Sequence, residues 1–336
     1  MKVLVTGGGG FLGSAVCRQL LARGDDVIAY QRSAADELQV LGIEVVQGDI
    51  TDTDLLERTS RQVDAIIHTA AKAGLSVNYD AYFAPNVTGT QSVLDACRSN
   101  GIDKLVFTSS PSVTHSDGDI EGGDESLPYP ENYNSPYPAT KALAEKAVMA
   151  ANCAELHTVS LRPHLIWGPG DNHLVPRIIG RARHLRRVGD GRNLVDTVYI
   201  DNAADAHILA AEVLKTRPEL SGRKYFISQG EPMPLWEMIN AILEAAGLPP
   251  VRKSISLRTA RRLGGVMEIL YRFLRLENEP PMTRFVAEEL ATSHWFDIGA
   301  ARRDLGYRPV VSTAEGLLRL ARWLDPSRSK GSKIKT

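Results

Sequence analysis

Short, uniformly apolar runs alternate with segments of helix length in the first half of the chain, and this alternation most constrains the fold. The runs are too apolar on both faces for half-exposed strands, which is typical of a parallel sheet covered on both sides. Helix-length segments such as Phe11–Arg23 and Val87–Asn100 separate them. Such an order implies right-handed crossovers, so the sequence predicts an α/β fold with a doubly wound parallel sheet. The predicted strands are Lys2–Gly7, Asp26–Tyr30, Ile43–Asp49, Asp64–Ala70, Lys104–Ser110 and His157–Pro163.

The alternation loosens after the turn at Trp167–Gly170, where we predict that the organisation of the chain changes. Residues 1–170 are predicted to carry the parallel sheet. Residues 171–325 are predicted to form a smaller, mixed α/β substrate-binding lobe that is not an independent domain. The final segment, 326–336, is polar and basic and is predicted to be a disordered tail.

Composition and charge limit the classes of function. The 336 residues are 43% hydrophobic and 24% charged, which is ordinary for a globular protein, and the net charge of -1 gives no reason to expect nucleic acid as a partner. Cys17, Cys97 and Cys153 are few and far apart, so neither a disulfide framework nor a metal site is expected. We find neither a secretion leader nor a membrane-spanning run, and therefore expect a cytoplasmic protein.

The stretch TGGGGFLG, from Thr6 to Gly13, follows the first predicted strand and opens a helix. Glycines are needed there for a tight turn, for close approach of the backbone to a pyrophosphate, and for packing of helix on strand. The helix N-terminus adds free N–H groups and a positive potential. The loop therefore predicts dinucleotide binding through Gly7, Gly10, Phe11, Leu12 and Gly13.

The end of the second strand should select the cofactor, because an NAD site usually has a carboxylate there for the adenosine ribose. The chain has Gln31-Arg32-Ser33 at that place. Arg32 can bind a 2′-phosphate through two hydrogen bonds and Ser33 can add a hydroxyl, so we predict NADP(H), with NAD(H) as the alternative. If Arg32 is only a solvated loop residue, this preference has no basis.

Two further strand ends are predicted to contact the cofactor. Asp49 and Ile50 follow the third strand and are placed to meet the adenine, unless Asp49 is only a turn residue. Ala70 and Ala71 follow the fourth strand, and their small side chains suit a backbone that lies against a cofactor.

Tyr137 lies between two prolines at the start of a predicted helix. Ser135 can cap that helix, Pro136 suits its first position and Pro138 falls within its first turn, where N–H groups have no intrahelical partner. Lys141 then lies one turn after Tyr137 on nearly the same face. Chance alone can produce such a pair, but a preceding strand also ends in Ser109-Ser110, at the sheet edge where the cofactor is expected.

These side chains suit proton transfer to or from a substrate oxygen. Lowering a tyrosine pKa from near 10 to about 7 requires roughly 4 kcal/mol. One positive charge at about 4 Å supplies that much in an effective dielectric of about 20, and Lys141 can be that charge. Ser110 can hold the substrate oxygen while Tyr137 exchanges the proton.

With these residues, the chain resembles the extended short-chain dehydrogenase/reductases, and more narrowly the 3β-hydroxysteroid dehydrogenase family. The stretches that carry the resemblance are SPYPATKALAEKAVMAAN, LRPHLIWGPGD, VYIDNAADAHILAAEVL, YFISQGEPMPLWEMI and AARRDLGYRPVVS, within residues 2–324. The resemblance implies a Rossmann-like fold and an NAD(P)-dependent oxidoreductase. Within the family, the match also suits the 2-alkyl-3-oxoalkanoate reductases of bacterial long-chain olefin biosynthesis.

The resemblance also implies roles for single residues. Ser110, three residues before Val113, would orient the substrate oxygen; Tyr137 would be the acid/base; and Lys141 would lower its pKa and hold the ribose. Pro163 and His164 would lie near the nicotinamide carboxamide. Relatives more often have a small residue at position 164, so we expect His164 to be a packed histidine.

The substrate lobe is less informative. A basic helix with an apolar stripe is predicted at Ser254–Leu276, and it is either core with solvated arginines or a lid that contacts a membrane surface. Either a long-chain 2-alkyl-3-keto acid or a 3-hydroxysterol with or without a 4-carboxylate suits an apolar, cationic lobe, and we favour the keto acid, reduced by NADPH. A sugar-nucleotide epimerase and a non-catalytic dinucleotide sensor stay open, as do a homodimer and an assembly with pathway enzymes.

Overall fold

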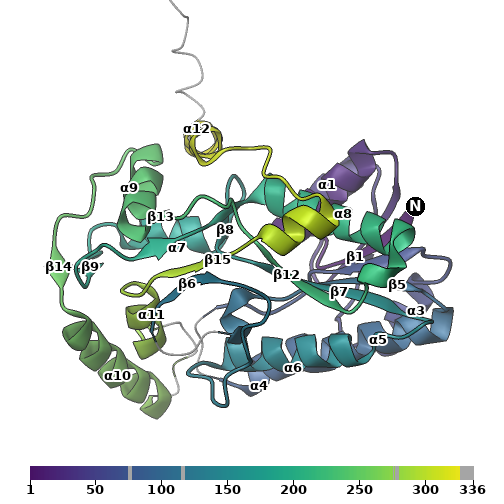
Figure 1. Ribbon diagram of the computed structural model, residues 1–336, viewed down its shortest axis with the longest axis horizontal. Coiled ribbons are helices and arrows are strands. Elements are labelled where there is room, and N and C mark those ends of the chain that lie inside the picture. The colour runs from purple at the N-terminus through teal and green to yellow at the C-terminus, as the bar shows by residue number, and fades with distance from the viewer. Residues whose placement is uncertain (75–77, 115–117, 275, 277–279, 326–336) are drawn as a thin grey trace, which may run out of the picture.

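The structure is a computed structural model that describes residues 1–74, 78–114, 118–274, 276 and 280–325. The predicted tail at 326–336 lies outside the described residues. Figure 1 shows a central sheet with helices on both faces and, at one end, a second group of strands and helices that includes α9, α10 and α11.

The central sheet has seven strands in the order β12-β7-β5-β4-β1-β2-β3, and every pairing within it is parallel. This confirms the predicted doubly wound parallel sheet. From β1 the chain adds strands first on one side and then on the other, so the order reverses between β1 and β4, where ligands bind in such sheets. The strands are β1 (Lys2–Thr6), β2 (Asp26–Gln31), β3 (Glu44–Gln47), β4 (Ala65–His68), β5 (Lys104–Thr108), β7 (His157–Pro163) and β12 (Arg223–Ile227).

Helices cover both faces of this sheet (Figure 1). One face carries α1 (Phe11–Ala22) and α8 (Ile200–Thr216), which pack on each other, and the other carries α3 (Thr53–Thr59), α5 (Gly89–Asn100) and α6 (Pro136–Ala150). A π-helical turn at Ala84–Thr88 precedes α5, so the regular helix begins slightly later than predicted. Two shorter α-helices next to the central sheet are α2 (Asp36–Val40) and α4 (Asp80–Phe83).

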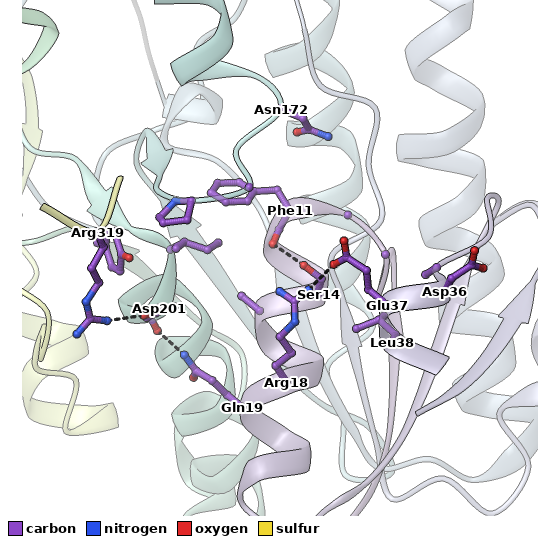
Figure 2. A pocket seen from close by; sticks show the side chains of 18 of the residues that line it. Phe11, Ser14, Arg18, Gln19, Asp36, Glu37, Leu38, Asn172, Asp201 and Arg319 are labelled. Carbon is purple, nitrogen blue, oxygen red and sulfur yellow. Dashed lines mark hydrogen bonds and ion pairs between the residues drawn. The ribbon is translucent and has the colours of Figure 1, made fainter. Parts of the chain in front are cut away.

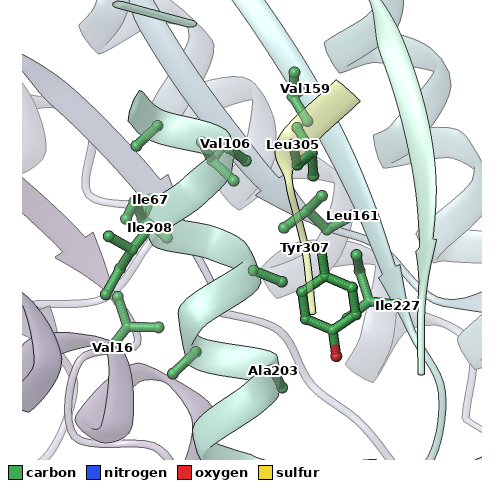
Figure 3. Packing of buried hydrophobic residues seen from close by; sticks show 14 of the residues in the cluster. Val16, Ile67, Val106, Val159, Leu161, Ala203, Ile208, Ile227, Leu305 and Tyr307 are labelled. Atoms are coloured by element: carbon green, nitrogen blue, oxygen red, sulfur yellow. The ribbon is translucent and has the colours of Figure 1, made fainter. Parts of the chain in front are cut away.

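Buried hydrophobic side chains pack between α8 and the central sheet (Figure 3). Its sheet-facing side is rich in buried alanines, among them Ala203, and Ile208 adds a larger side chain. These pack with Val106 and Leu161 of the sheet and with Val16 of α1 in one buried cluster. Small side chains on α8 allow its backbone to approach the strands without leaving cavities.

The second group of elements is a smaller mixed α/β unit, called the lobe. Its largest sheet has the order β13-β10-β15-β6, and two-stranded sheets join β11 with β8 and β14 with β9. Its strands are β6 (Ile120–Gly123), β8 (Ile166–Trp167), β9 (Arg187–Val188), β10 (Leu194–Val195), β11 (Val198–Tyr199), β13 (Met233–Pro234), β14 (Ser254–Ile255) and β15 (His294–Phe296). Its helices are α7 (Leu174–Arg181), α9 (Leu235–Ala245), α10 (Leu257–Phe273), α11 (Arg284–Glu289) and α12 (Thr313–Leu324).

The chain crosses between the two sheets on both sides of residue 170. Strand β6 precedes this position but belongs to the lobe sheet, whereas α8 and β12 follow it and belong to the central unit. A single cut at residue 170 therefore does not separate the two sheets, because long-range pairing rather than sequence order assigns these elements.

Helix α10 begins at Leu257, after the short strand β14, and so covers only part of the helix predicted at 254–276. Ala260 and Gly264 are its buried residues. A Cβ on Gly264 would lie 2.5 Å from the carbonyl carbon of Thr283, so glycine permits close contact with the start of α11. The rest of the apolar stripe is largely exposed and is not core.

Candidate active site

The glycine loop joins β1 to α1 in the conformation that its sequence predicts. Gly7 has a φ of +71°, and a Cβ on it would lie 2.8 Å from the nitrogen of Ala70. A Cβ on Gly13 would lie 2.1 Å from the carbonyl oxygen of Gly7, so the helix can start this close to the turn only with glycine. Helix α1 has Gly10 at its N-cap, and no side chain of the described residues caps it. This tight cradle under a helix N-terminus fits a dinucleotide pyrophosphate.

Helix α6 begins at Pro136, as predicted, with Ser135 at its N-cap. The Ser135 side chain makes no capping hydrogen bond within the described part of the chain, in contrast to the expectation. Proline has no N–H, so Pro138 at the third helical position cannot donate to this cap, and only the N–H of Tyr137 at the second position is left for it.

The phenol of Tyr137 hydrogen-bonds with Ser110, which joins α6 to the end of β5. Burial raises the pKa of Tyr137 above its usual value, the hydrogen bond with Ser110 acts to lower the pKa, and the nearby Tyr82 acts to raise it. The arrangement of the protein side chains therefore keeps the phenol protonated, as a proton donor must be.

Lys141 is buried one helical turn after Tyr137. Its Nζ donates to the carbonyl oxygen of Thr108 at 2.6 Å and lies 4.2 Å from the ring centroid of Phe107. Burial lowers the pKa of Lys141 to about 7, against the opposing charge of Glu145. Lys141 is not among the groups that shift the pKa of Tyr137, so its predicted effect on the tyrosine stays a prediction.

The two candidate serines occupy different environments. Ser110 Oγ lies 2.8 Å from Ser112 Oγ and also bonds Tyr137. Ser109 is buried, and its Oγ has no hydrogen-bond partner among the described residues. Ser110 is thus the serine that contacts Tyr137, and the orphaned Ser109 hydroxyl beside it is available to a bound group.

A cavity of about 420 Å³ lies where the two units meet. It brings together the glycine loop, the end of β5, the start of α6 and residues of the lobe. Ten of the predicted site residues line it: Gly7, Gly10, Phe11, Leu12, Gly13, Ala71, Ser110, Tyr137, Lys141 and Pro163.

The other predicted cofactor residues are not among the residues that line this cavity. Arg32 and Ser33 are exposed after β2, Asp49 is exposed and Ile50 buried after β3, and Ala70 follows β4. Strands β2 and β3 are neighbours, β1 separates them from β4, and the parallel strands end at the same edge, where an adenosine would extend from the glycine loop.

The surroundings of Asp49, which the sequence did not reveal, lower its pKa. Hydrogen bonds from the backbone N–H and hydroxyl of Thr51 lower the pKa of Asp49, and the nearby charge of Arg32 adds to this effect. Arg32 is therefore exposed, as phosphate binding requires, but it also lies near the Asp49 carboxylate.

A second hollow, of about 780 Å³, is larger but is not the reactive site (Figure 2). It lies along α1, and four of its charged side chains form two ion pairs: Arg18 with Glu37 at 2.9 Å and Arg319 with Asp201 at 3.2 Å. Ser110, Tyr137 and Lys141 do not line it.

Several residues of the reactive cavity could not be identified from the sequence. Arg177, Phe285, Glu289 and His294 line it from segments far apart in the chain that share no motif. His164, which the family resemblance placed near the nicotinamide, lines it directly after β7.

No helix among the described residues is long and apolar enough to cross a membrane. No group of three or more His, Cys, Asp or Glu residues in the described part of the chain is placed to hold a metal ion.

The chain is similar to a known protein family and to several characterised relatives. A family model described as 3-beta hydroxysteroid dehydrogenase/isomerase matches residues 4–258. A 2-alkyl-3-oxoalkanoate reductase of Stenotrophomonas maltophilia is 54% identical over 95% of this chain and 98% of the relative. A decarboxylating sterol-4-alpha-carboxylate 3-dehydrogenase of Schizosaccharomyces pombe is 33% identical over 98% of this chain and 99% of the relative.

Solved structures share the whole fold. A double mutant of dTDP-glucose 4,6-dehydratase from Streptomyces venezuelae, with NAD bound, matches with a TM-score of 0.75 and 28% identity. The match covers 98% of both chains.

Proposed function

The chain belongs to the 3-beta hydroxysteroid dehydrogenase/isomerase family and is an NAD(P)-dependent oxidoreductase, and we propose that it reduces the 3-keto group of a long-chain 2-alkyl-3-oxoalkanoate with NADPH. The product is then the 2-alkyl-3-hydroxyalkanoate. We further propose that this step belongs to bacterial long-chain olefin biosynthesis and takes place in the cytoplasm.

The observation that carries the proposal is the contact between the Tyr137 phenol and Ser110 in the cavity beside the glycine loop. Ketone reduction requires a proton donor at the developing alkoxide. Ser110 orients the keto oxygen, Tyr137 gives it a proton, and Lys141 fixes the geometry by joining α6 to β5. A bound nicotinamide supplies the hydride for the keto carbon.

NADPH rather than NADH is proposed because the end of β2 has Arg32 and Ser33 in place of a carboxylate. The Asp49 carboxylate lies near Arg32 and would partly repel a 2′-phosphate. The preference for NADPH over NADH therefore depends on whether the Arg32 guanidinium binds the phosphate or pairs with Asp49. The glycine loop, Phe11, Leu12, Asp49, Ile50, Ala70, Ala71 and Pro163 would contact the remaining parts of the dinucleotide.

The experiment is an NADPH- and NADH-oxidation assay of the purified protein with 2-alkyl-3-keto acids and with 3-ketosteroids. We expect turnover of the keto acids with NADPH, and its loss by at least about 10²-fold in Tyr137→Phe. The control is Tyr133→Phe, which removes a hydroxyl that donates to the carbonyl of Val113 at 2.9 Å. Turnover of 3-ketosteroids with NADH, without any activity on keto acids, would contradict the proposal.

A second candidate is a 3β-hydroxysteroid dehydrogenase, favoured by the relative that acts, by its name, on a sterol 4-carboxylate. In that substrate, as in the keto acid, the reacting oxygen lies β to a carboxylate. The assay with 3β-hydroxysterols and both oxidised cofactors tests it directly. Tightly bound NAD in the purified protein would instead favour an epimerase.

We also propose that α10 docks on an anionic membrane surface, from which the apolar substrate can be taken up. Its exposed face includes Val266, Ile269 and Phe273, which are 64%, 70% and 83% exposed. Arg258, Arg262 and Arg272 are exposed on the same helix. A second copy of α10 would bring like charges together, whereas anionic headgroups complement them.

Co-sedimentation with vesicles tests this surface. We expect binding to phosphatidylglycerol/phosphatidylethanolamine vesicles, weaker binding to phosphatidylcholine vesicles, and loss of binding in the double variant Ile269→Ser/Phe273→Ser. Val310→Ser is the control, because Val310 is 78% exposed elsewhere. Unchanged binding in the double variant, or a dimer that the double variant abolishes, would contradict the membrane assignment.

A further inference from the structure

We propose that His207, a buried histidine on α8, is a positioning residue that sets the place of Lys141 through Thr108. The helices that carry His207 and Lys141 cover opposite faces of the central sheet (Figure 1), and both side chains bond to Thr108 at the end of β5. The inference concerns the nicotinamide-dependent site and holds whichever substrate that site reduces. It assigns a role to a buried polar side chain that neither the glycine loop nor the contact between Ser110 and Tyr137 uses.

Thr108 is the last residue of β5, and its two polar groups bond to different helices. Its Oγ1 lies 2.8 Å from Nε2 of His207, and its carbonyl oxygen accepts the hydrogen bond from Lys141 Nζ at 2.6 Å. Successive side chains of a strand point to opposite faces, so Thr108 shares the α8 side with Val106. Phe107 lies on the other side, where its ring centroid is 4.2 Å from Lys141 Nζ. One residue thus receives bonds from both helix layers.

The local structure of α8 fixes the ring of His207. Its Nδ1 lies 2.7 Å from the carbonyl oxygen of Ala203, one turn earlier in the same helix. A carbonyl oxygen only accepts, so Nδ1 carries a proton. Ala203 and Ala206 are among the buried alanines that let α8 lie close to the sheet. This closeness brings the far side of the ring within hydrogen-bond distance of Thr108.

The protons of this hydrogen-bond chain can be placed. His207 is fully buried, and burial lowers its pKa to about 4, against the opposing effect of the bond to Ala203. At neutral pH the ring is therefore neutral, with its single proton on Nδ1 and a lone pair on Nε2. Nε2 accepts from the hydroxyl of Thr108, which is the donor. The bond holds the Thr108 side chain in one orientation and so anchors the end of β5.

The position of this strand end matters for the chemistry of the site. Lys141 is buried, so its ammonium needs an acceptor within the protein, and the carbonyl oxygen of Thr108 is one. Ser110, two residues after Thr108, contacts Tyr137. A shift of Thr108 therefore displaces the acceptor of Lys141 and the partner of Tyr137 together, and small displacements of reacting groups lower the rate strongly.

His207 acts on the reacting groups from outside the cavity. Thr108 lines the reactive cavity, whereas His207 does not line it. A substitution at position 207 can therefore move Lys141 without removing an atom that faces the substrate. This arrangement predicts a loss of kcat with little change in the KM of the substrate, in contrast to the loss of a substrate-binding residue.

The test compares two substitutions that each keep one of the two hydrogen bonds of His207. In His207→Gln the amide oxygen can replace Nε2 and accept from Thr108, whereas the shorter side chain in His207→Asn reaches only the carbonyl of Ala203. We expect His207→Asn to lower kcat by about 10-fold with KM changed by less than about 2-fold, and His207→Gln to keep most of the wild-type kcat. Oxidation of NADPH or NADH is followed with whichever keto compound the protein turns over.

The control for a merely structural effect is Ile208→Ala. It removes a buried side chain from the same helix and should lower the melting temperature while kcat stays at the wild-type value. Equal losses of kcat in His207→Asn, His207→Gln and Ile208→Ala would overturn the positioning role, because all three would then act through stability. An unchanged kcat in His207→Asn would overturn it as well.

A double-mutant cycle tests whether Thr108 is the partner through which His207 acts. Thr108→Val removes the hydroxyl and keeps the shape of the side chain. The double variant Thr108→Val/His207→Asn should have a kcat no lower than that of the slower single variant, because both substitutions remove the same bond. Losses of kcat that multiply in the double variant would show that the two residues act independently.

Histidine ¹⁵N spectra need no substrate and separate this inference from the proposed function. At neutral pH we expect the signals that His207→Gln removes to be those of a neutral ring protonated on Nδ1, and Thr108→Val to shift the Nε2 resonance. The signals of exposed His184 should not move. A ring protonated on Nε2, or an Nε2 resonance that Thr108→Val leaves unchanged, would overturn the hydrogen-bond chain. If these spectra are as expected and no keto acid is reduced, only the proposed function is wrong.

Discussion

Lys141 Nζ donates to the carbonyl oxygen of Thr108 at 2.6 Å, and this bond ties the helix that carries Tyr137 to the strand that leads to Ser110. The lysine is buried at that position, so its ammonium exists at the cost of desolvation. Lys141 therefore holds two parts of the site together and makes stability depend on pH.

Lys141→Met should flatten the pH dependence of stability. Because burial lowers the pKa of Lys141 to about 7 from 10.5, the folded state binds fewer protons than the unfolded state between these values. The free energy of unfolding of the wild type therefore rises with pH across that window, by on the order of a few kcal/mol. Urea unfolding at several pH values checks this, with exposed Lys146→Met as the control; parallel curves for wild type and Lys141→Met would contradict it.

Ser110→Ala should lower kcat about 10²-fold, since it removes the group that contacts Tyr137 and orients the substrate oxygen. Ser109→Ala should leave the chemistry intact, because Ser109 Oγ makes no hydrogen bond within the described structure. If that hydroxyl binds the cofactor, the same variant raises KM for the dinucleotide. Steady-state kinetics of both variants distinguishes these roles, and a larger loss of kcat in Ser109→Ala would reverse the assignment.

Arg32→Ala should lower kcat/KM for NADPH by about 10- to 100-fold and leave that for NADH nearly unchanged, because only a 2′-phosphate needs the guanidinium. The measurement is the ratio of the two values in the variant and the wild type. Exposed Arg61→Ala is the matched control. A ratio that Arg32→Ala leaves constant would show that NADPH is not selected at this position.

Gly13→Ala should impair both folding and dinucleotide binding. Its Cβ would lie 2.1 Å from the Gly7 carbonyl oxygen, so the helix must move away from the loop. Gly180→Ala, in α7, meets no atom within 4 Å and should be neutral or stabilising by up to about 1 kcal/mol. Thermal unfolding and cofactor titration of the two variants check the contrast; equal melting temperatures would contradict the steric argument.

Much of the fold could be predicted because its signals are local. The apolar runs predicted the strands β1 to β5 and β7 within a few residues. The inner strands are apolar because both of their faces are buried, whereas the edge strand β3 is only partly buried. The prolines around Tyr137 predicted the start of α6, because proline is tolerated only in the first turn of a helix.

Elements with weak local signals were harder to assign. The place of β6 in the lobe sheet and of β12 in the central sheet depends on pairing partners far along the chain. The apolar stripe of α10 predicted either core or a contact surface, and only the tertiary structure shows that Ala260 and Gly264 are buried while Val266, Ile269 and Phe273 are exposed.

The sequence by itself determined the crossover sheet, the glycine loop and the Tyr137–Lys141 spacing, because backbone sterics and helix periodicity act over a few residues. Tertiary structure decided which serine meets Tyr137, where Lys141 donates its hydrogen bond, and that Arg177, His164 and His294 share a cavity wall. Hydrogen-bond partners and burial depend on groups brought together from distant segments, and those partners also determine the charges in the site.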